Sequence, residues 1–259
     1  MHLVCVGPKD TGEPTILLEA GGGLSYGSWG DVLSSMLQEH RLCAYDRAGI
    51  GDSEPPTEAS RTVADQVADL EALLDGAGIS GPFVIGAHSV GAVNALLFTK
   101  ARPDDVVGLV LVDPRAPRVS AEWLAALPAP AAGEPTDLTR FRDELTTFET
   151  DPSMNDEHVL IRDSFEIGAA ALDETDSFFG DRPVVVLSAE HTPRGWATLP
   201  PDVADRLTEI WSDAQQALAD ESTAGSRETV PGVGHNIQAE APEAVVDALE
   251  RVLAQVLAS

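Results

Sequence analysis

Lysine is nearly absent from this sequence. Only Lys9 and Lys100 occur among 259 residues, and 16 lysines and arginines stand against 43 acidic residues, a formal net charge of −27. Nucleic acids require basic patches and anionic membranes repel such a surface, so the composition excludes both as partners. Strong acidity is typical of proteins adapted to high salt, where screening weakens self-repulsion. The Asp/Ala/Arg bias of some mesophilic proteins accounts for the same composition, and both interpretations stay open.

Cysteines and long apolar runs are also scarce. The two cysteines, Cys5 and Cys43, lie in strand-like segments, and we expect both to be free, buried thiols, as in most intracellular chains. No apolar run approaches the ~20 residues of a membrane span, and the segment MHLVCVGPKD lacks the features of a signal peptide. These absences predict a cytoplasmic protein. Nothing in the sequence indicates its oligomeric state.

The rest of the chain predicts an α/β domain with a substantial core, since 43% of its residues are apolar. Two runs, 83–87 and 106–112, are continuously apolar, as in strands buried on both faces of a parallel sheet. Repeated strand and helix patterns predict a doubly wound, mostly parallel sheet flanked by helices. Strands are expected at 2–6, 15–19, 41–45, 83–87, 106–112, 183–189 and 227–230, and helices at 30–38, 62–75, 90–100, 202–220 and from 242.

One stretch interrupts this alternation. Residues 114–182 carry apolar side chains at helical spacing, with Pro- and Gly-rich breaks at 128–135. We therefore predict a helical cap at 114–182, inserted into a core domain that comprises residues 1–113 and 183–259.

The segment FVIGAHSVGAVNALL is the most informative one for function. A buried strand runs through Ala87 and His88 into Ser89, Val90 and Gly91, and a helix follows at once. A turn of this kind lifts the serine hydroxyl above the sheet edge and needs small residues two positions before and after it. The helix N-terminus also directs N–H groups toward charge that develops on a substrate oxygen. The pattern predicts a nucleophilic serine.

Several motifs, in this order, resemble those of the α/β-hydrolase family over nearly the whole chain. LLEAGGGLSYGSW resembles the family's oxyanion loop, AYDRAGIGDSEPP the segment after its fourth strand, and GAHSVG its nucleophile elbow. VLVDP resembles the end of the sixth strand, so the cap follows that strand, and PGVGHNIQAEAPEAV resembles the histidine loop. The resemblance also implies that the chain begins at the family's second strand.

The resemblance assigns Ser89 as nucleophile and His235 as general base. It assigns the oxyanion hole to the backbone N–H groups of Gly22 and Val90. The glycine run is no dinucleotide motif, because Tyr26 occupies the place of the last required glycine. The expected substrate pocket comprises Gly23, Tyr26, His88, Trp123, Phe141 and Ile237.

The acidic member of the triad departs from the family pattern. Members usually carry it in a Gly-x-x-Asp turn after the seventh strand, where this chain has Ala189-Glu190-His191-Thr192. Thr192 cannot supply a negative charge to the histidine. We favour Asp113, at the end of the sixth strand, with Glu190 as the alternative acid; a site without a third member also stays open.

Together these residues predict an esterase-type serine hydrolase that forms an acyl-enzyme on Ser89. Its expected substrates are small to medium, neutral, hydrophobic esters. Lactonase, thioesterase and carbon–carbon bond hydrolase activities stay open, as does iminopeptidase activity, because Glu144, Glu149 and Glu166 of the cap could hold an amine. A non-catalytic receptor with this fold is the alternative of another class. The histidines show no metal-ligand spacing, so we expect no metal and no cofactor.

Overall fold

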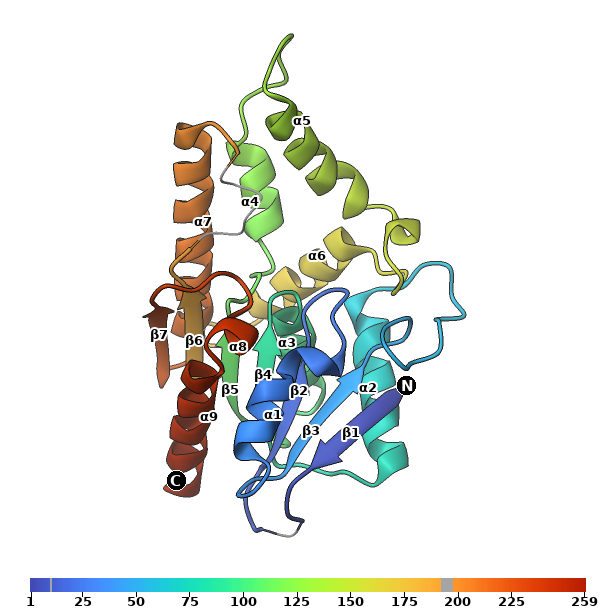
Figure 1. Ribbon diagram of the computed structural model, residues 1–259, viewed down its shortest axis with the longest axis vertical. Coiled ribbons are helices and arrows are strands. Elements are labelled where there is room, and N and C mark those ends of the chain that lie inside the picture. Colours follow the sequence, from blue (N-terminus) through green and yellow to red (C-terminus); the bar gives the residue numbers. More distant parts are fainter. Residues whose placement is uncertain (10, 192–197) are drawn as a thin grey trace.

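Seven strands form the centre of the protein: β1 (His2–Val6), β2 (Thr15–Glu19), β3 (Leu42–Asp46), β4 (Phe83–His88), β5 (Val106–Val112), β6 (Val184–Ala189) and β7 (Gly225–Val230). They form one sheet in the order β1-β3-β2-β4-β5-β6-β7 (Figure 1). The computed structural model describes residues 1–9, 11–191 and 198–259. β1 runs antiparallel to β3, and the other neighbouring strands are parallel. The expected doubly wound, mostly parallel sheet is therefore confirmed, with strands close to their predicted bounds.

Nine α-helices are present among the described residues: α1 (Gly30–Met36), α2 (Val63–Ala77), α3 (Gly91–Ala101), α4 (Val119–Ala126), α5 (Thr136–Asp143), α6 (Ile161–Leu172), α7 (Pro201–Asp220), α8 (Ile237–Glu240) and α9 (Pro242–Leu257). Short 3₁₀ segments, η1 (Tyr26–Trp29) and η3 (Pro152–Met154), and a π-helical segment, η2 (Glu144–Phe148), complete the elements. No helix in the described ranges is both long enough and apolar enough to cross a membrane.

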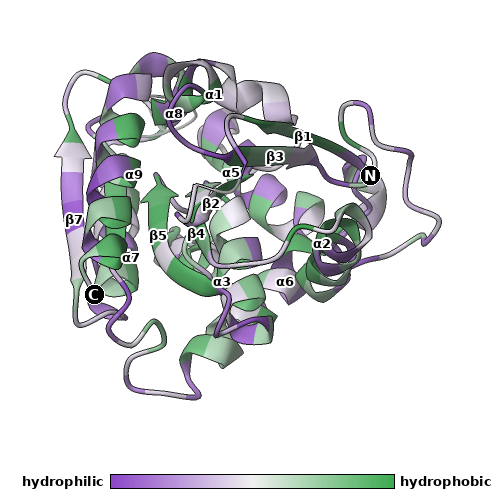
Figure 2. Ribbon diagram, turned by 90° about the horizontal axis from the view of Figure 1, so that it is seen from below, coloured by the Kyte–Doolittle hydropathy of each residue, from purple (hydrophilic) through white to green (hydrophobic). Residues whose placement is uncertain are grey.

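The sheet carries an apolar core on each face. Side chains alternate along a strand, so Leu109 and Leu111 of β5 pack on one face and Val110 and Val112 on the other. α2, α3 and α6 cover the first face, and α1, α8 and α9 cover the second. Figure 2 shows β4 and β5 at the centre in hydrophobic green. The continuous apolar runs of these strands are therefore explained by burial on both sides.

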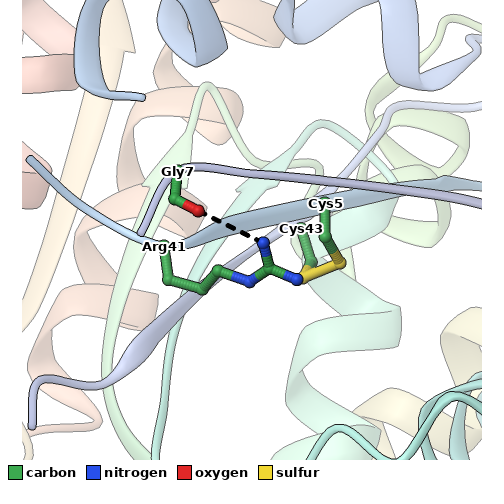
Figure 3. Close-up of a disulfide and its surroundings, with 4 residues drawn as sticks. All are labelled: Cys5, Gly7, Arg41 and Cys43. Carbon is green, nitrogen blue, oxygen red and sulfur yellow. Dashed lines mark hydrogen bonds between the residues drawn. A yellow bond between two sulfur atoms is a disulfide. The ribbon is translucent and has the colours of Figure 1, made fainter. Parts of the chain in front are cut away.

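β1 brings the two cysteines together, and the expectation of free thiols is wrong. Because β1 is antiparallel to β3, Cys5 lies directly opposite Cys43, and the two form a disulfide (Figure 3). In the same region, Arg41 Nη1 donates to the carbonyl oxygen of Gly7 at 3.4 Å. Opposite residues of an antiparallel pair lie within reach of a disulfide. The sequence reveals neither the pairing of these strands nor its register.

The residues between β5 and β6 form the expected helical insertion, which extends beyond the sheet at the top of Figure 1. It has a small apolar core of its own, in which Trp123 and Leu145 join Leu207 and Trp211 of α7. The other end of α7, with Leu218, packs on the sheet. The apolar core of the insertion thus includes a helix that follows the expected boundary at 182/183.

Candidate active site

Ser89 lies in a sharp turn between β4 and α3. Its φ of 54° is unusual for a residue with a side chain. The turn is held by hydrogen bonds from Ser89 N–H to the Val112 carbonyl at 3.1 Å and from Arg115 N–H to the Ser89 carbonyl at 3.0 Å. A Cβ at Gly91 would come within 2.6 Å of the Ala20 carbonyl oxygen, so that position must be glycine. This is the backbone geometry that the elbow pattern predicts.

Ser89, His235 and Asp113 form one chain of hydrogen bonds. His235 Nε2 is 2.9 Å from Ser89 Oγ, and His235 Nδ1 is 2.6 Å from Asp113 Oδ2. Asp113 is completely buried, and its other oxygen accepts hydrogen bonds from Gln215 Nε2 at 2.8 Å and Trp211 Nε1 at 3.2 Å. With the carboxylate fixed in this way, the Nδ1 proton points at Asp113. Nε2 is then free to accept the serine proton.

The alternative acid occupies a different place. Glu190 Oε2 accepts a hydrogen bond from the Gly232 N–H at 2.7 Å. Among the residues that the structure describes, Asp113 is the carboxylate in contact with His235. Thr192, at the position where the family usually carries the acid, lies outside the described residues.

Two backbone N–H groups beside Ser89 have no protein acceptor within the described part of the chain. They belong to Gly22, in the glycine loop after β2, and to Val90, in the elbow. Both residues line the same cavity as Ser89. Gly22 lies so close to the elbow that a Cβ on it would come within 3.1 Å of Val90 Cγ2. These free donors are what an oxyanion hole needs.

A buried ionic network braces the glycine loop. Arg47 Nη2 donates to the Gly21 carbonyl oxygen at 2.7 Å, and Glu157, from the insertion, accepts from the Gly23 N–H at 3.1 Å. Arg47 pairs with Glu19 and, through Nε, with Glu157 at 2.6 Å. Burial raises the pKa of Glu19. Burial also opposes ionisation of Glu157, but the Arg47 guanidinium outweighs it and lowers that pKa.

His88 supports the histidine loop. Its Nε2–H donates to the His235 carbonyl oxygen at 2.9 Å, and the two rings lie 4.7 Å apart. Burial and the neighbouring His235 lower the pKa of His88 to about 3, so the ring is neutral near pH 7. A Cβ at Gly21 would come within 2.6 Å of His88 Nδ1, which explains the first glycine of the loop.

A cavity of about 300 Å³ opens beside Ser89, between the core and the helical insertion. Gly22, Gly23 and Val90 line it from the core. From the insertion it is lined by Phe148, Asn155, Glu157, Val159, Ile161, Ser164 and Phe165, and Arg115 reaches it from just after β5. Sequence reasoning missed Arg115, Glu157 and Phe165. The one available signal was the position of Arg115, two residues after Asp113.

Of the expected pocket residues, Gly23 lines this cavity and the other five lie elsewhere. Ile237 is fully buried in the core beneath α9, and Trp123 stacks on Trp211 with ring centroids 5.3 Å apart. Phe141 packs against Trp123, Tyr26 lies edge-on to His2, and His88 contacts the histidine loop as described above. Trp123 and Phe141 thus belong to the insertion's own apolar core and not to the wall of the cavity.

One cluster of metal-ligand types occurs among the described residues. The ligand atoms of His2, Asp46 and Asp52 lie within 4.8 Å of one another. Asp46 is already engaged, since its oxygens accept the N–H groups of Tyr26 at 2.7 Å and Asp52 at 3.0 Å. The cluster fastens the segment after β3 and gives no argument for a metal.

The chain belongs to the alpha/beta hydrolase family, whose model matches residues 16–248. Lipase LipV of Mycobacterium tuberculosis is 37% identical over 114 residues, which cover 44% of this chain and 41% of the lipase. The uncharacterized protein YqjL of Bacillus subtilis is 39% identical over 106 residues, 41% of this chain and 42% of YqjL. The chain thus spans less than half the length of these relatives.

A solved structure with a similar fold is that of a thermophilic esterase from Thermogutta terrifontis. It matches with a TM-score of 0.65 and 20% identity, over 98% of this chain and 93% of the esterase. At this identity the similarity shows the fold.

Proposed function

We propose that this protein is a serine hydrolase that cleaves carboxylic esters through an acyl-enzyme on Ser89. The observation that carries the proposal is the hydrogen-bonded chain from Asp113 through His235 to Ser89, with distances of 2.6 and 2.9 Å. The two free N–H groups and the 300 Å³ cavity beside the serine agree with it. A lipase among the relatives and an esterase of the same fold agree as well.

In acylation, Ser89 Oγ attacks the ester carbonyl carbon while His235 Nε2 takes the hydroxyl proton. Asp113 stabilises the imidazolium that forms. The N–H groups of Gly22 and Val90 bind the negative oxygen of the tetrahedral intermediate. When the intermediate collapses, the bond to the alcohol oxygen breaks and His235 gives that oxygen the proton.

Deacylation repeats these steps with water. His235 takes a proton from the water molecule as its oxygen attacks the acyl carbon. Collapse of the second intermediate returns the proton to Ser89 Oγ and releases the acid. The chain's own side chains and N–H groups perform every step.

The same serine, histidine and N–H groups can cleave lactones and thioesters, so the test includes both classes of substrate. Iminopeptidase activity is less well supported. Of the acids that could hold an amine, Glu149 is paired with Arg115, while Glu144 and Glu166 are not among the residues that line the cavity.

The test combines covalent labelling with kinetics. We expect a fluorophosphonate probe to label Ser89, and p-nitrophenyl esters of graded chain length to be hydrolysed. Ser89→Ala and His235→Ala should each lower kcat by about 10⁴-fold. Ser34→Ala, an exposed helical serine, is the matched control and should leave kcat unchanged. Absence of labelling and of hydrolysis of esters, thioesters and lactones would favour the receptor alternative.

A further inference from the structure

Arg115 places a guanidinium in the wall of the substrate cavity. Its backbone N–H donates to the Ser89 carbonyl at 3.0 Å, so the side chain starts next to the nucleophile. The guanidinium carbon lies 5.3 Å from the Trp123 ring centroid and 5.0 Å from that of Phe165. Packing against two aromatic rings holds the group in one position.

Most of its donors are unused. A guanidinium has five N–H bonds. Nη2 donates to Ser120 Oγ at 2.7 Å and to Glu149, which accounts for two of them. Nε is enclosed without an acceptor, and Nη1 donates to no side chain or carbonyl within the described residues. The two N–H bonds of Nη1 are therefore available to an oxygen acceptor bound in the cavity that Arg115 lines, whereas the Nε–H is enclosed and out of its reach.

The charges around the cavity favour an uncharged acceptor. Glu149 is buried and paired with Arg115, so the pair as a whole is neutral. Arg47, the other cationic lining residue, is paired with both Glu19 and Glu157. A carboxylate on the substrate would therefore lie near three buried glutamates with no unpaired cation. A ketone, amide or ether oxygen accepts a hydrogen bond without this repulsion.

We propose that Arg115 is a specificity-determining residue, which selects esters carrying an uncharged oxygen acceptor on the part of the substrate that fills the cavity. This inference rests on the proposed ester hydrolysis and narrows it. It keeps the neutral esters that the sequence predicts but adds a polar oxygen to their hydrophobic part. Arg115 and Phe165 together bind a polar oxygen on an otherwise apolar chain.

The test uses matched esters. Ethyl 4-oxopentanoate and ethyl pentanoate differ by a ketone on the acyl side, and 4-oxopentyl acetate and pentyl acetate differ in the same way on the alcohol side. Monoethyl succinate replaces the ketone by a carboxylate. We expect the wild-type kcat/KM to favour the ketone in at least one pair by about tenfold to hundredfold, as for a hydrogen bond to a charged donor. Monoethyl succinate should be the poorest acyl-side substrate.

Two variants separate the effect of the Arg115 hydrogen-bond donors from the effect of the Glu149 charge. Arg115→Met alone would leave Glu149 buried and unpaired, so it is combined with Glu149→Gln. In the double variant the ratio of kcat/KM for the ketone ester to that for its matched ester should fall to about one. Glu149→Gln alone should keep the wild-type ratio and should raise kcat/KM for monoethyl succinate by about tenfold. Persistence of the ketone preference in the double variant would overturn the proposal. So would its absence from both wild-type pairs, or a wild-type preference for monoethyl succinate.

A binding measurement separates this proposal from the proposed hydrolysis. Calorimetry with Ser89→Ala, alone and combined with Arg115→Met and Glu149→Gln, gives the affinity for all four neutral esters without turnover. If wild-type protein hydrolyses none of the esters, the proposed function fails. Tighter binding of a ketone, lost in the triple variant, would then still support the Arg115 site, and equal binding in both backgrounds would refute it.

Discussion

Arg47 Nη2 donates to the carbonyl oxygen of Gly21 at 2.7 Å, and this hydrogen bond orients the next N–H group along the chain. In a trans peptide, the C=O of Gly21 and the N–H of Gly22 point in opposite directions. Arg47 therefore directs the Gly22 N–H away from itself. An arginine that does not take part in proton transfer thus positions one of the proposed oxyanion donors.

Arg47→Lys tests this role. Lysine keeps the charge but lacks the planar fork that serves Gly21, Glu19 and Glu157 together. We expect kcat for ester hydrolysis to fall about tenfold to hundredfold with a smaller change in KM, because the oxyanion donor acts mainly in the transition state. Arg102→Lys, at a surface ion pair, is the control. A lower melting temperature with unchanged kcat would mean that Arg47 serves stability alone.

The choice between the two acids gives a second prediction. Asp113→Asn should lower kcat by about 10⁴-fold, because the amide no longer fixes the histidine tautomer. Glu190→Gln should stay near wild-type activity, since its carboxylate accepts from the backbone of Gly232. Steady-state kinetics on one ester compare the two variants. If Glu190→Gln lowers kcat strongly and Asp113→Asn does not, Glu190 is the acid of the triad.

His88 predicts a pH dependence of stability. Burial lowers its pKa to about 3 in the folded protein, below the ordinary histidine value of 6.5. Below pH 6.5 the unfolded chain binds a proton at His88 that the folded protein does not bind, and this favours unfolding. The contribution of the neutral His88 to the free energy of unfolding is therefore complete above pH 6.5 and is lost as the pH falls toward 3.

Denaturant titrations of wild type and His88→Gln between pH 7 and pH 4 measure this difference. The free energy of unfolding should fall more steeply with decreasing pH in wild type, by up to about 1.4 kcal/mol per pH unit. His191→Gln, at an exposed position, should keep the wild-type slope. Parallel curves for wild type and His88→Gln would show that folding leaves the pKa of His88 unshifted.

The disulfide should contribute measurable stability. Cys5 and Cys43 are 38 residues apart, and closing a loop of that length is expected to stabilise the folded state by up to about 4 kcal/mol. A reductant should lower the melting temperature of wild type and leave that of the Cys5→Ser/Cys43→Ser variant unchanged. Thiol titration of the unfolded, unreduced protein should detect no free thiol. Detection of both thiols would contradict the disulfide.

The large negative net charge of the chain predicts that its thermal stability rises with salt concentration. The accessible surface of 11339 Å² carries the formal net charge of −27. The Debye length shrinks from ~30 Å at 0.01 M salt to ~3 Å at 1 M, which weakens the repulsion. The melting temperature should therefore increase between these NaCl concentrations, and equally in KCl. A flat or falling curve would favour the compositional-bias interpretation.

Local patterns were sufficient to predict the fold class and the elbow. The apolar runs of β4 and β5 and the small residues around Ser89 reflect burial and backbone conformation within a few positions, so they can be read directly. The histidine position came from the family resemblance of the segment around His235. For Asp113 the sequence left a choice, because contact with His235 depends on how β5 lies beside the histidine loop.

Other features required the packed protein. The disulfide depends on the antiparallel register of β1 against β3, and the cavity wall depends on how Arg115, Glu157 and Phe165 approach Ser89 from separate segments. α7 packs on both the sheet and the insertion, although its sequence shows an ordinary amphipathic helix. Helical and strand periodicity act between near neighbours in the chain and are visible in the sequence. Contacts between distant residues follow from sheet register and helix packing, which come into existence only when the chain has folded.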